Sequence, residues 1–112
     1  MLPRAKAALF DIAHASLGIS QFIENKTPEE YQSDLMLRSA VERQLIIIGE
    51  AMTRIRKEDP VTAARISEYD RIITFRNILV HGYDRLDDVT IWKIIHEKLP
   101  TLAREVEELL KT

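Results

Sequence analysis

Apolar residues recur at intervals of three and four along most of the chain, and this spacing constrains the fold more than any other feature. Two series comprise Ala5, Leu9, Ile12, Ser16, Ile19 and Ile23, and then Val41, Leu45, Ile48, Met52 and Ile55. A third comprises Val89, Trp92, Ile95, Leu99, Leu102, Val106 and Leu109. Such intervals place side chains on one face of an α-helix. With only 3 glycines and 4 prolines to interrupt them, long helices are predicted.

The first helix is predicted over residues 2–24. Pro3 suits the first turn of a helix, where its missing N–H costs nothing, and Asn25 can end the helix because asparagine tolerates a left-handed backbone. A second start follows at Thr27, which can cap a helix together with Glu30 three residues later. The residues leave open whether this second helix continues into the next apolar series.

A long helix carries the second apolar series. Ser33 or Asp34 can start it anew as an N-cap, and it is predicted to reach about Lys57. The pair Asp59–Pro60 ends it, because the residue before a proline disfavours the helical conformation.

The remaining helices occupy the second half of the chain. Residues 61–68 are predicted to form a short helical link, and residues 69–81 a largely apolar, central helix with Gly82 as its natural C-terminal stop. The β-branched residues of 69–81 also permit a strand, which is the lesser alternative. The last helix starts at residue 87 or 88, and Pro100 is expected to kink or restart it. These segments predict an all-α, antiparallel bundle of four to five helices.

Length and composition bound the function. The chain has 112 residues, so residues 1–112 are predicted to form a single domain, with little room for a deep catalytic cavity within one copy. It contains no cysteine, which excludes disulfides, thiolate zinc sites and a cysteine nucleophile. The first residues lack the apolar core of a signal peptide, and the longest apolar run, residues 45–48, is too short to span a bilayer. A cytoplasmic protein is therefore expected.

The charge distribution limits how the chain can bind nucleic acid. The formal net charge of −2 argues against a generic nucleic-acid coat, which needs a strongly basic surface. Basic residues outnumber acidic ones between residues 38 and 76, so the middle of the chain can still form a local arginine-lined site. Arg38 and Arg43 are expected either to contact RNA phosphates or to form ion pairs at an interface. Glu50 is expected to pair with a residue one turn away, such as Arg54.

Four polar or titratable side chains surround an apolar run between residues 76 and 83, namely Arg76, Asn77, His81 and Tyr83. Histidine can give or take a proton near neutral pH, and arginine presents a planar fork of donors that suits a phosphate. Cleavage of a phosphodiester by a neighbouring 2′-hydroxyl requires both functions, because one group must move a proton and another must stabilise charge on the five-coordinate phosphorus. Such a reaction needs no metal and no nucleophilic side chain.

The spacing of Arg76 and His81 limits how they can act together. Five residues turn about 500° on an α-helix, which leaves the two about 140° apart, whereas Asn77 and His81 share a face. A joint site therefore needs the chain to leave helical geometry at His81, which Gly82 permits, or a second copy of the chain to complete it. The plainer alternative is that His81 only caps the helix by donating to its carbonyls, with Tyr83 packed beneath.

The other candidate residues favour structure over chemistry. His14, His81 and His96 lack the short spacings of metal ligands, so no metal site is predicted. Trp92 belongs to the third apolar series and is interpreted as packing rather than base stacking, and His96 is expected to be exposed or paired with an acidic residue. Residues 46–47 widen the apolar arc of their helix, and this surplus suggests burial against another chain.

Three blocks of the sequence resemble the HepT-like toxin branch of the HEPN superfamily. Residues 76–83 match its R-x4-H-x-Y motif, and residues 41–51 resemble its second-helix signature. Residues 76–83 followed by 89–95 resemble its C-terminal half. The bare R-x4-H pattern has low specificity, but the three blocks in this order and spacing are much more specific and agree over nearly the full chain.

The resemblance implies a homodimeric all-α bundle in which both Arg/His pairs meet in one cleft. It implies a metal-independent endoribonuclease without a cofactor, acting as the toxin of a toxin–antitoxin pair. Arg76 and His81 correspond to the catalytic pair, and Asn77 to the polar residue that commonly follows the arginine. Tyr83 corresponds to a tyrosine that a minimal nucleotidyltransferase antitoxin adenylylates. AMP attached there would bring negative charge and bulk into a cleft meant for RNA phosphates.

A second function is compatible with the same residues. The chain could serve as a non-catalytic helical subunit that docks on a nucleotidyltransferase and presents a substrate or binds a nucleotide. The negative net charge favours this alternative slightly. Full activity of the complex with His81→Ala would distinguish it from the ribonuclease.

Overall fold

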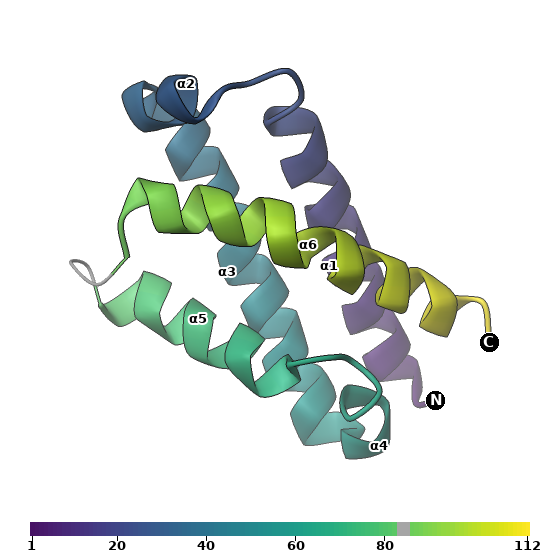
Figure 1. The fold of residues 1–112 in the computed structure, drawn as a ribbon. Helices are drawn as coiled ribbons and strands as arrows, with labels where there is room; N and C mark the ends of the chain where they lie inside the picture. The colour runs from purple at the N-terminus through teal and green to yellow at the C-terminus, as the bar shows by residue number, and fades with distance from the viewer. Residues whose placement is uncertain (83–85) are drawn as a thin grey trace.

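The computed structural model describes residues 1–82 and 86–112, which form six α-helices and no strand (Figure 1). In chain order the helices are α1 (Pro3–Phe22), α2 (Pro28–Ser33), α3 (Leu35–Glu58), α4 (Pro60–Ala63), α5 (Tyr69–His81) and α6 (Asp88–Leu110). The all-α prediction is confirmed, and the alternative of a strand over residues 69–81 is wrong. Tyr83 lies outside the described residues, and the expectations for it remain predictions.

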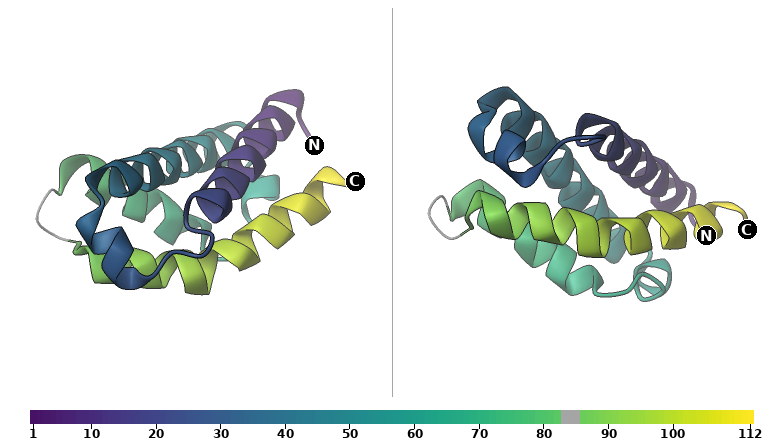
Figure 2. Two further views of the ribbon diagram at one scale, coloured as in Figure 1. Left: turned by 90° about the horizontal axis from the view of Figure 1, so that it is seen from above. Right: turned by 45° about the horizontal axis from the view of Figure 1, so that its top comes forward.

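Three long helices, α1, α3 and α6, form the frame of the bundle. α1 and α3 run antiparallel along each other, α6 crosses α1, and α5 packs on α3 (Figures 1 and 2). The link predicted over residues 61–68 is helical only as far as Ala63, in α4. Because α5 is held mainly by α3, its other faces remain available for function.

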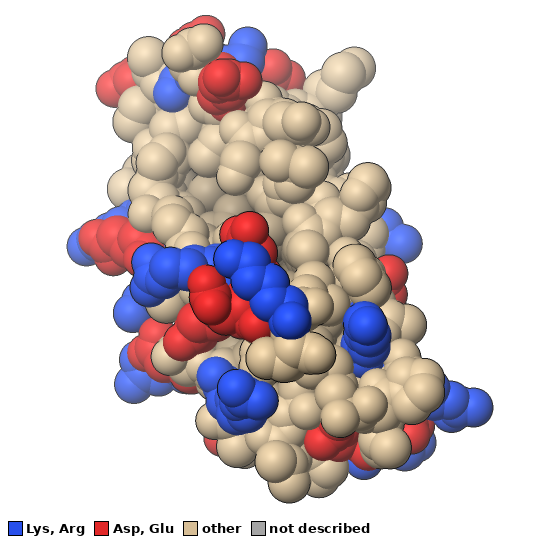
Figure 3. Space-filling view, turned by 90° about the vertical axis from the view of Figure 1, so that its right-hand side faces the viewer, with Lys and Arg blue, Asp and Glu red and all other residues tan. Residues whose placement is uncertain are grey.

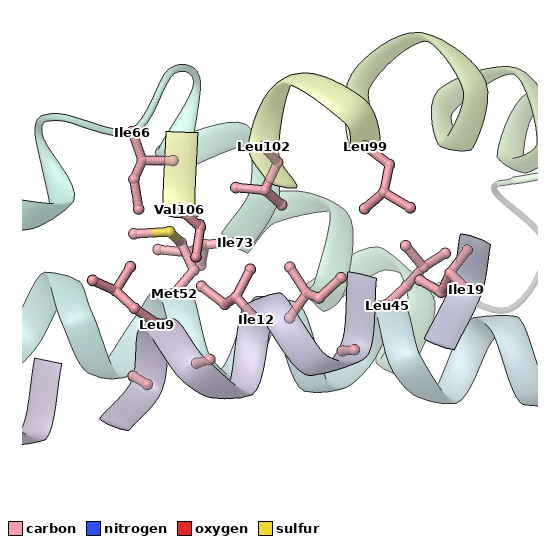
Figure 4. Packing of buried hydrophobic residues seen from close by; sticks show 14 of the residues in the cluster. Leu9, Ile12, Ile19, Leu45, Met52, Ile66, Ile73, Leu99, Leu102 and Val106 are labelled. Carbon is pink, nitrogen blue, oxygen red and sulfur yellow. The ribbon is translucent and has the colours of Figure 1, made fainter. Parts of the chain in front are cut away.

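The core lies where α1, α3 and α6 meet. Leu9 and Ile12 of α1 lie beside Met52 of α3 and Val106 of α6, and all four are fully buried (Figure 4). The apolar series predicted for the first two long helices are buried from Ala5 to Ile19 and from Val41 to Ile55. The spacing rule therefore identified the faces that stabilise the fold through burial of apolar surface.

The third apolar series needs a correction at its start. Val89 is 59% exposed, whereas Ile91 is 3% exposed and is the first residue of α6 in the core. Val89 and Ile95 are six residues apart, which places them about 120° apart around an α-helix. Val89 therefore lies outside the apolar face. Trp92 is half-buried and packs against the core, with its ring centroid 5.3 Å from that of Tyr31. Its interpretation as a packing residue is confirmed.

The predicted helix boundaries around residue 30 are present. The Glu30 N–H donates to Thr27 Oγ1 (3.1 Å) and the Thr27 N–H donates to Glu30 Oε1 (3.0 Å), which is the reciprocal pair of a capping box. Asp34 Oδ1 accepts from the Leu37 N–H (3.1 Å) and starts α3. Asn25 has a left-handed φ of 61° just after α1. α2 and α3 are therefore separate helices.

Gly82 ends α5 as predicted, with a φ of −112°. Two other local expectations need correction. Of the two effects expected of Pro100, the restart is absent, because this proline lies on an exposed face where water can bind the carbonyl that it leaves without a donor. Arg54 pairs with Asp11 of α1 rather than with Glu50, because α1 packs along α3 and offers an acceptor across the interface.

Candidate active site

Arg76, Asn77 and His81 all lie on the second half of α5. The helix ends at His81, where the Gly82 N–H donates to the carbonyl of Ile78 (2.7 Å). The backbone is therefore helical up to and including His81, so the first of the two predicted ways to join Arg76 and His81, a departure from helical geometry, is wrong. Along the axis the two Cα atoms are about 7.5 Å apart, and around it about 140°.

The stem of Arg76 packs directly on the backbone of α3 at Gly49. A Cβ atom at position 49 would lie 2.1 Å from Arg76 Cβ and 2.5 Å from Arg76 Cγ, far inside contact distance. Arg76 Nε is buried and has no hydrogen-bond partner among the described residues. Glycine at position 49 is therefore what allows α3 and α5 to approach this closely. Sequence reasoning missed its role, although a glycine inside a long helix is a signal of close approach.

Asn77 connects the two faces of α5 that carry Arg76 and His81. Arg76 Nη1 donates to Asn77 Oδ1 (2.9 Å). Asn77 is exposed and lies one turn before His81, which is also exposed, so these two share a face as predicted. The backbone positions of Arg76 and His81 point apart, but the hydrogen bond ties the end of the arginine side chain to the residue one turn before His81.

These three side chains form an open surface within one chain. The described residues line a half-open pocket of about 460 Å³ elsewhere, between α3, α5 and α6, with Leu45, Phe75 and Ile95 in its wall. Arg76, Asn77 and His81 do not line it. A phosphate from solvent can therefore approach the exposed face of α5 directly, but nothing in the described part of one chain shields it from water.

Arg38 is held inside the chain between α2 and α6. Its Nη1 donates to the carbonyls of Tyr31 (3.5 Å) and Gln32, and its Nε lies 3.5 Å from Asp88 Oδ2. The side chain is only 21% exposed. Arg43, on the same helix, is exposed. Of these two arginines, Arg43 is the one that can reach RNA or a second copy without breaking the contacts above.

A buried polar cluster lies where α2, α3 and the start of α6 meet. Tyr31 is fully buried, and its hydroxyl has no hydrogen-bond partner among the described residues. Burial, reinforced by the negative charges of Glu42 and Asp88, raises the pKa of Tyr31. Burial and then Asp88 also raise the pKa of Glu42, against the opposing effect of Arg38. The sequence did not reveal this cluster, because α2 is too short for an apolar series and Glu42 resembles a surface charge.

The raised pKa of Glu42 predicts a dependence of stability on pH. Its proton is bound more tightly in the folded than in the unfolded chain, so its contribution is fully present below the ordinary glutamate pKa and is lost as pH rises through the raised value. Glu42→Gln removes the charge and should raise the thermal midpoint at pH 7 by about 1–2 °C, a small gain because solvent screens the charge of this partly exposed carboxyl. At pH 4 the gain should vanish, as circular dichroism melts can show.

Glu24→Gln is the matched control, because Glu24 is exposed in the turn after α1. The same chemical change there should leave the midpoint unchanged at both pH values. Equal gains in both variants would contradict a role for burial at position 42.

The distribution of charged and metal-ligating side chains outside the candidate site bears on the sequence-based expectations. On the side of α1 and the C-terminal end of α6, positive and negative side chains are interspersed rather than gathered into one basic surface (Figure 3). Within residues 1–82 and 86–112, no group of three or more His, Asp or Glu side chains could hold a metal ion. His96 is exposed, as expected, and its Nδ1 lies 2.8 Å from the Trp92 carbonyl oxygen. No helix in the described part of the chain is long and apolar enough to cross a membrane.

The chain is similar to known proteins along nearly its whole length. The profile of the family described as "Ribonuclease HepT-like" matches residues 12–109. A Methanocaldococcus jannaschii protein named "Putative RNase MJ1380" is 33% identical over 102 residues, which cover 91% of this chain and 93% of that protein. A Thermococcus cleftensis protein named "Probable ribonuclease HepT" is 32% identical over 106 residues, covering 95% and 96%. No solved structure matches the chain significantly.

The fold and the site define a small all-helical, HEPN-like domain with an arginine, an asparagine and a histidine at the exposed end of one helix. The chain belongs to the HepT-like ribonuclease family, whose match includes α5 and the α3 segment on which Arg76 packs. The resemblance seen in the three sequence blocks is therefore confirmed.

Proposed function

We propose that this protein is an endoribonuclease that cleaves RNA without a metal ion, with Arg76 and His81 as its catalytic residues. The observation that carries the proposal is the hydrogen bond from Arg76 to Asn77, which ties the end of the guanidinium to the exposed residue one turn before His81. Membership of the HepT-like ribonuclease family supports the same activity.

The chemistry uses the nucleophile that RNA itself supplies. The 2′-oxygen attacks the adjacent phosphorus as its proton leaves, and the bond from phosphorus to the 5′-oxygen breaks as that oxygen gains a proton. The products are a 2′,3′-cyclic phosphate and a free 5′-hydroxyl. Arg76 donates to the non-bridging oxygens, where negative charge develops in the transition state. His81 moves a proton, as a general acid or base, since an imidazole nitrogen can donate or accept one.

A homodimer would complete this site. The reaction needs one group to remove a proton and another to deliver one, and two copies of His81 in one cleft would supply both. Ile78 lies one turn before His81 and is half-buried, yet it is not among the described residues that pack against the core. This apolar side chain offers a second copy a contact beside the catalytic face. We therefore place both Arg/His pairs in one cleft between two copies, where Arg43 contacts RNA or the second copy.

The activity can be tested with chemically matched substrates. The purified protein in EDTA should cleave single-stranded RNA and leave 2′,3′-cyclic phosphate ends, because no metal takes part. The same sequence with 2′-O-methyl groups should stay intact, because its nucleophile is blocked. Cleavage of the methylated strand would contradict the mechanism, and failure to cleave any of several varied RNAs would contradict the function.

We further propose that the protein is the toxin of a toxin–antitoxin pair, neutralised when a minimal nucleotidyltransferase adenylylates Tyr83. The support is the motif in which Tyr83 follows His81 by two residues. AMP attached two residues after His81 in the sequence would add negative charge, which opposes the binding of RNA phosphates.

Intact-mass measurement tests this regulation. Incubation with ATP, Mg²⁺ and the nucleotidyltransferase should add mass in AMP-sized steps and abolish RNA cleavage, and Tyr83→Phe should prevent both changes. A stable complex whose full activity survives His81→Ala would instead favour the non-catalytic subunit.

A further inference from the structure

The contact between α3 and α5 at Gly49 is closer than ordinary helix packing. A Cβ atom at position 49 would overlap Arg76 Cβ and Cγ at 2.1 and 2.5 Å, while Arg76 Cα would lie at an ordinary 3.5 Å. Real Cβ atoms essentially never come within 3.0 Å of a non-bonded heavy atom from another part of the chain. The overlap therefore concerns the stem of one side chain, the arginine of the proposed active site, rather than the backbone of α5.

A second glycine shows that this approach is particular to position 49. Gly18 lies inside α1, and a Cβ atom there would meet only Phe22 Cζ, at 3.9 Å, which is ordinary contact. Gly49 is buried, whereas Gly18 is partly exposed. Glycine is disfavoured inside any helix because of its backbone freedom, so its presence at position 49 needs a reason that the packing at Gly18 does not give.

We propose that Gly49 is a positioning residue for RNA cleavage, which acts by seating the stem of Arg76 on the α3 backbone. The stem is fixed between two helices at Cβ and Cγ, and Asn77 holds the other end of the side chain through Nη1 (2.9 Å). With both ends fixed, the remaining guanidinium donors face a bound phosphate in a defined orientation. This inference rests on the proposed function, because its consequence for rate requires Arg76 to act in catalysis.

Misorientation of a group that acts only in the transition state lowers the rate of the chemical step, but it has little effect on substrate binding. Gly49→Ala should therefore lower kcat by about 100-fold, since a misplacement of about 1 Å has that order of effect, and should change KM for RNA by less than about threefold. Gly18→Ala should leave both constants unchanged. Equal losses in kcat for the two variants, or a loss confined to KM, would overturn the proposal.

A double-mutant cycle on thermal stability tests the contact between Gly49 and Arg76 without measuring activity. Gly49→Ala should lower the thermal midpoint of the wild-type chain, because the new Cβ displaces Arg76 and with it α5. In an Arg76→Gly background the same substitution should not lower the midpoint, because the two atoms that it would meet are gone. If Gly49→Ala alone does not fold, the double variant should still fold and melt cooperatively.

The outcomes of the two experiments are distinguishable. A fall of equal size in both backgrounds would show that Gly49 serves the bundle in general, and it would overturn the proposal. An inactive wild-type protein would contradict the proposed function, whereas the cycle would still decide whether Gly49 seats Arg76. Added guanidinium that restores cleavage to Arg76→Gly should restore it equally to the double variant, since Gly49 then has no arginine to position.

Discussion

Arg76→Ala and His81→Ala are each expected to lower the rate of RNA cleavage by about 100-fold or more, while the far-UV circular dichroism of both variants stays that of the wild type. His81 is exposed at the end of α5, so its loss creates no cavity. Alanine at position 76 keeps the Cβ that packs at Gly49 and removes only the guanidinium and the rest of the stem. Single-turnover cleavage of a labelled RNA gives the rates.

Two matched variants control for charge and residue type. Arg65→Ala and His14→Ala remove the same residue types from exposed positions outside the end of α5 that carries the site, and both should cleave at the wild-type rate. Arg76→Lys keeps the charge but loses the planar fork, so its rate should fall between those of the wild type and Arg76→Ala. Wild-type rates in both alanine variants of the active site would rule out the assigned chemistry.

The features of the fold that depend on one helix alone could be predicted from the sequence, whereas contacts between helices could not. The spacing of three and four placed the buried faces of α1 and α3, and the capping box at Thr27 placed the start of α2, because both signals are local. Val89 was misplaced because the series that contained it drifts around the helix. Arg54 was misassigned because its partner Asp11 belongs to another helix. The spacing of residues within one helix does not predict which other helix packs against it.

The candidate site shows the same limit. Arg76, Asn77 and His81 stand out in the sequence as polar residues around an apolar run, but their spacing placed Arg76 and His81 on different faces. The hydrogen bond that ties the guanidinium of Arg76 to Asn77 is a contact between side chains, and backbone geometry cannot predict it. The seat at Gly49 depends on how closely α3 and α5 approach, which is a property of the assembled bundle.

Ile78→Asp is expected to convert the proposed dimer into a monomer and to lower RNA cleavage by about 100-fold at concentrations where the wild type is dimeric. Ile78 lies one turn before His81 and is half-buried without packing on the described core, so an aspartate can point into water in a single copy. Between two copies, the same change buries an unpaired charge, which is strongly unfavourable. Sedimentation velocity and single-turnover cleavage measure the two effects on one preparation.

Leu17→Asp provides the matched control, because Leu17 is 56% exposed on α1 and away from α5. It should leave both the mass in solution and the cleavage rate unchanged. If activity requires two copies of His81 in one cleft, the activity of Ile78→Asp should rise with the square of protein concentration, because each active unit needs two chains. A monomeric variant with wild-type activity, proportional to concentration, would show that one copy suffices. The exposed surface of α5 would then be the complete site, and a chain of this size would need no second copy for cleavage.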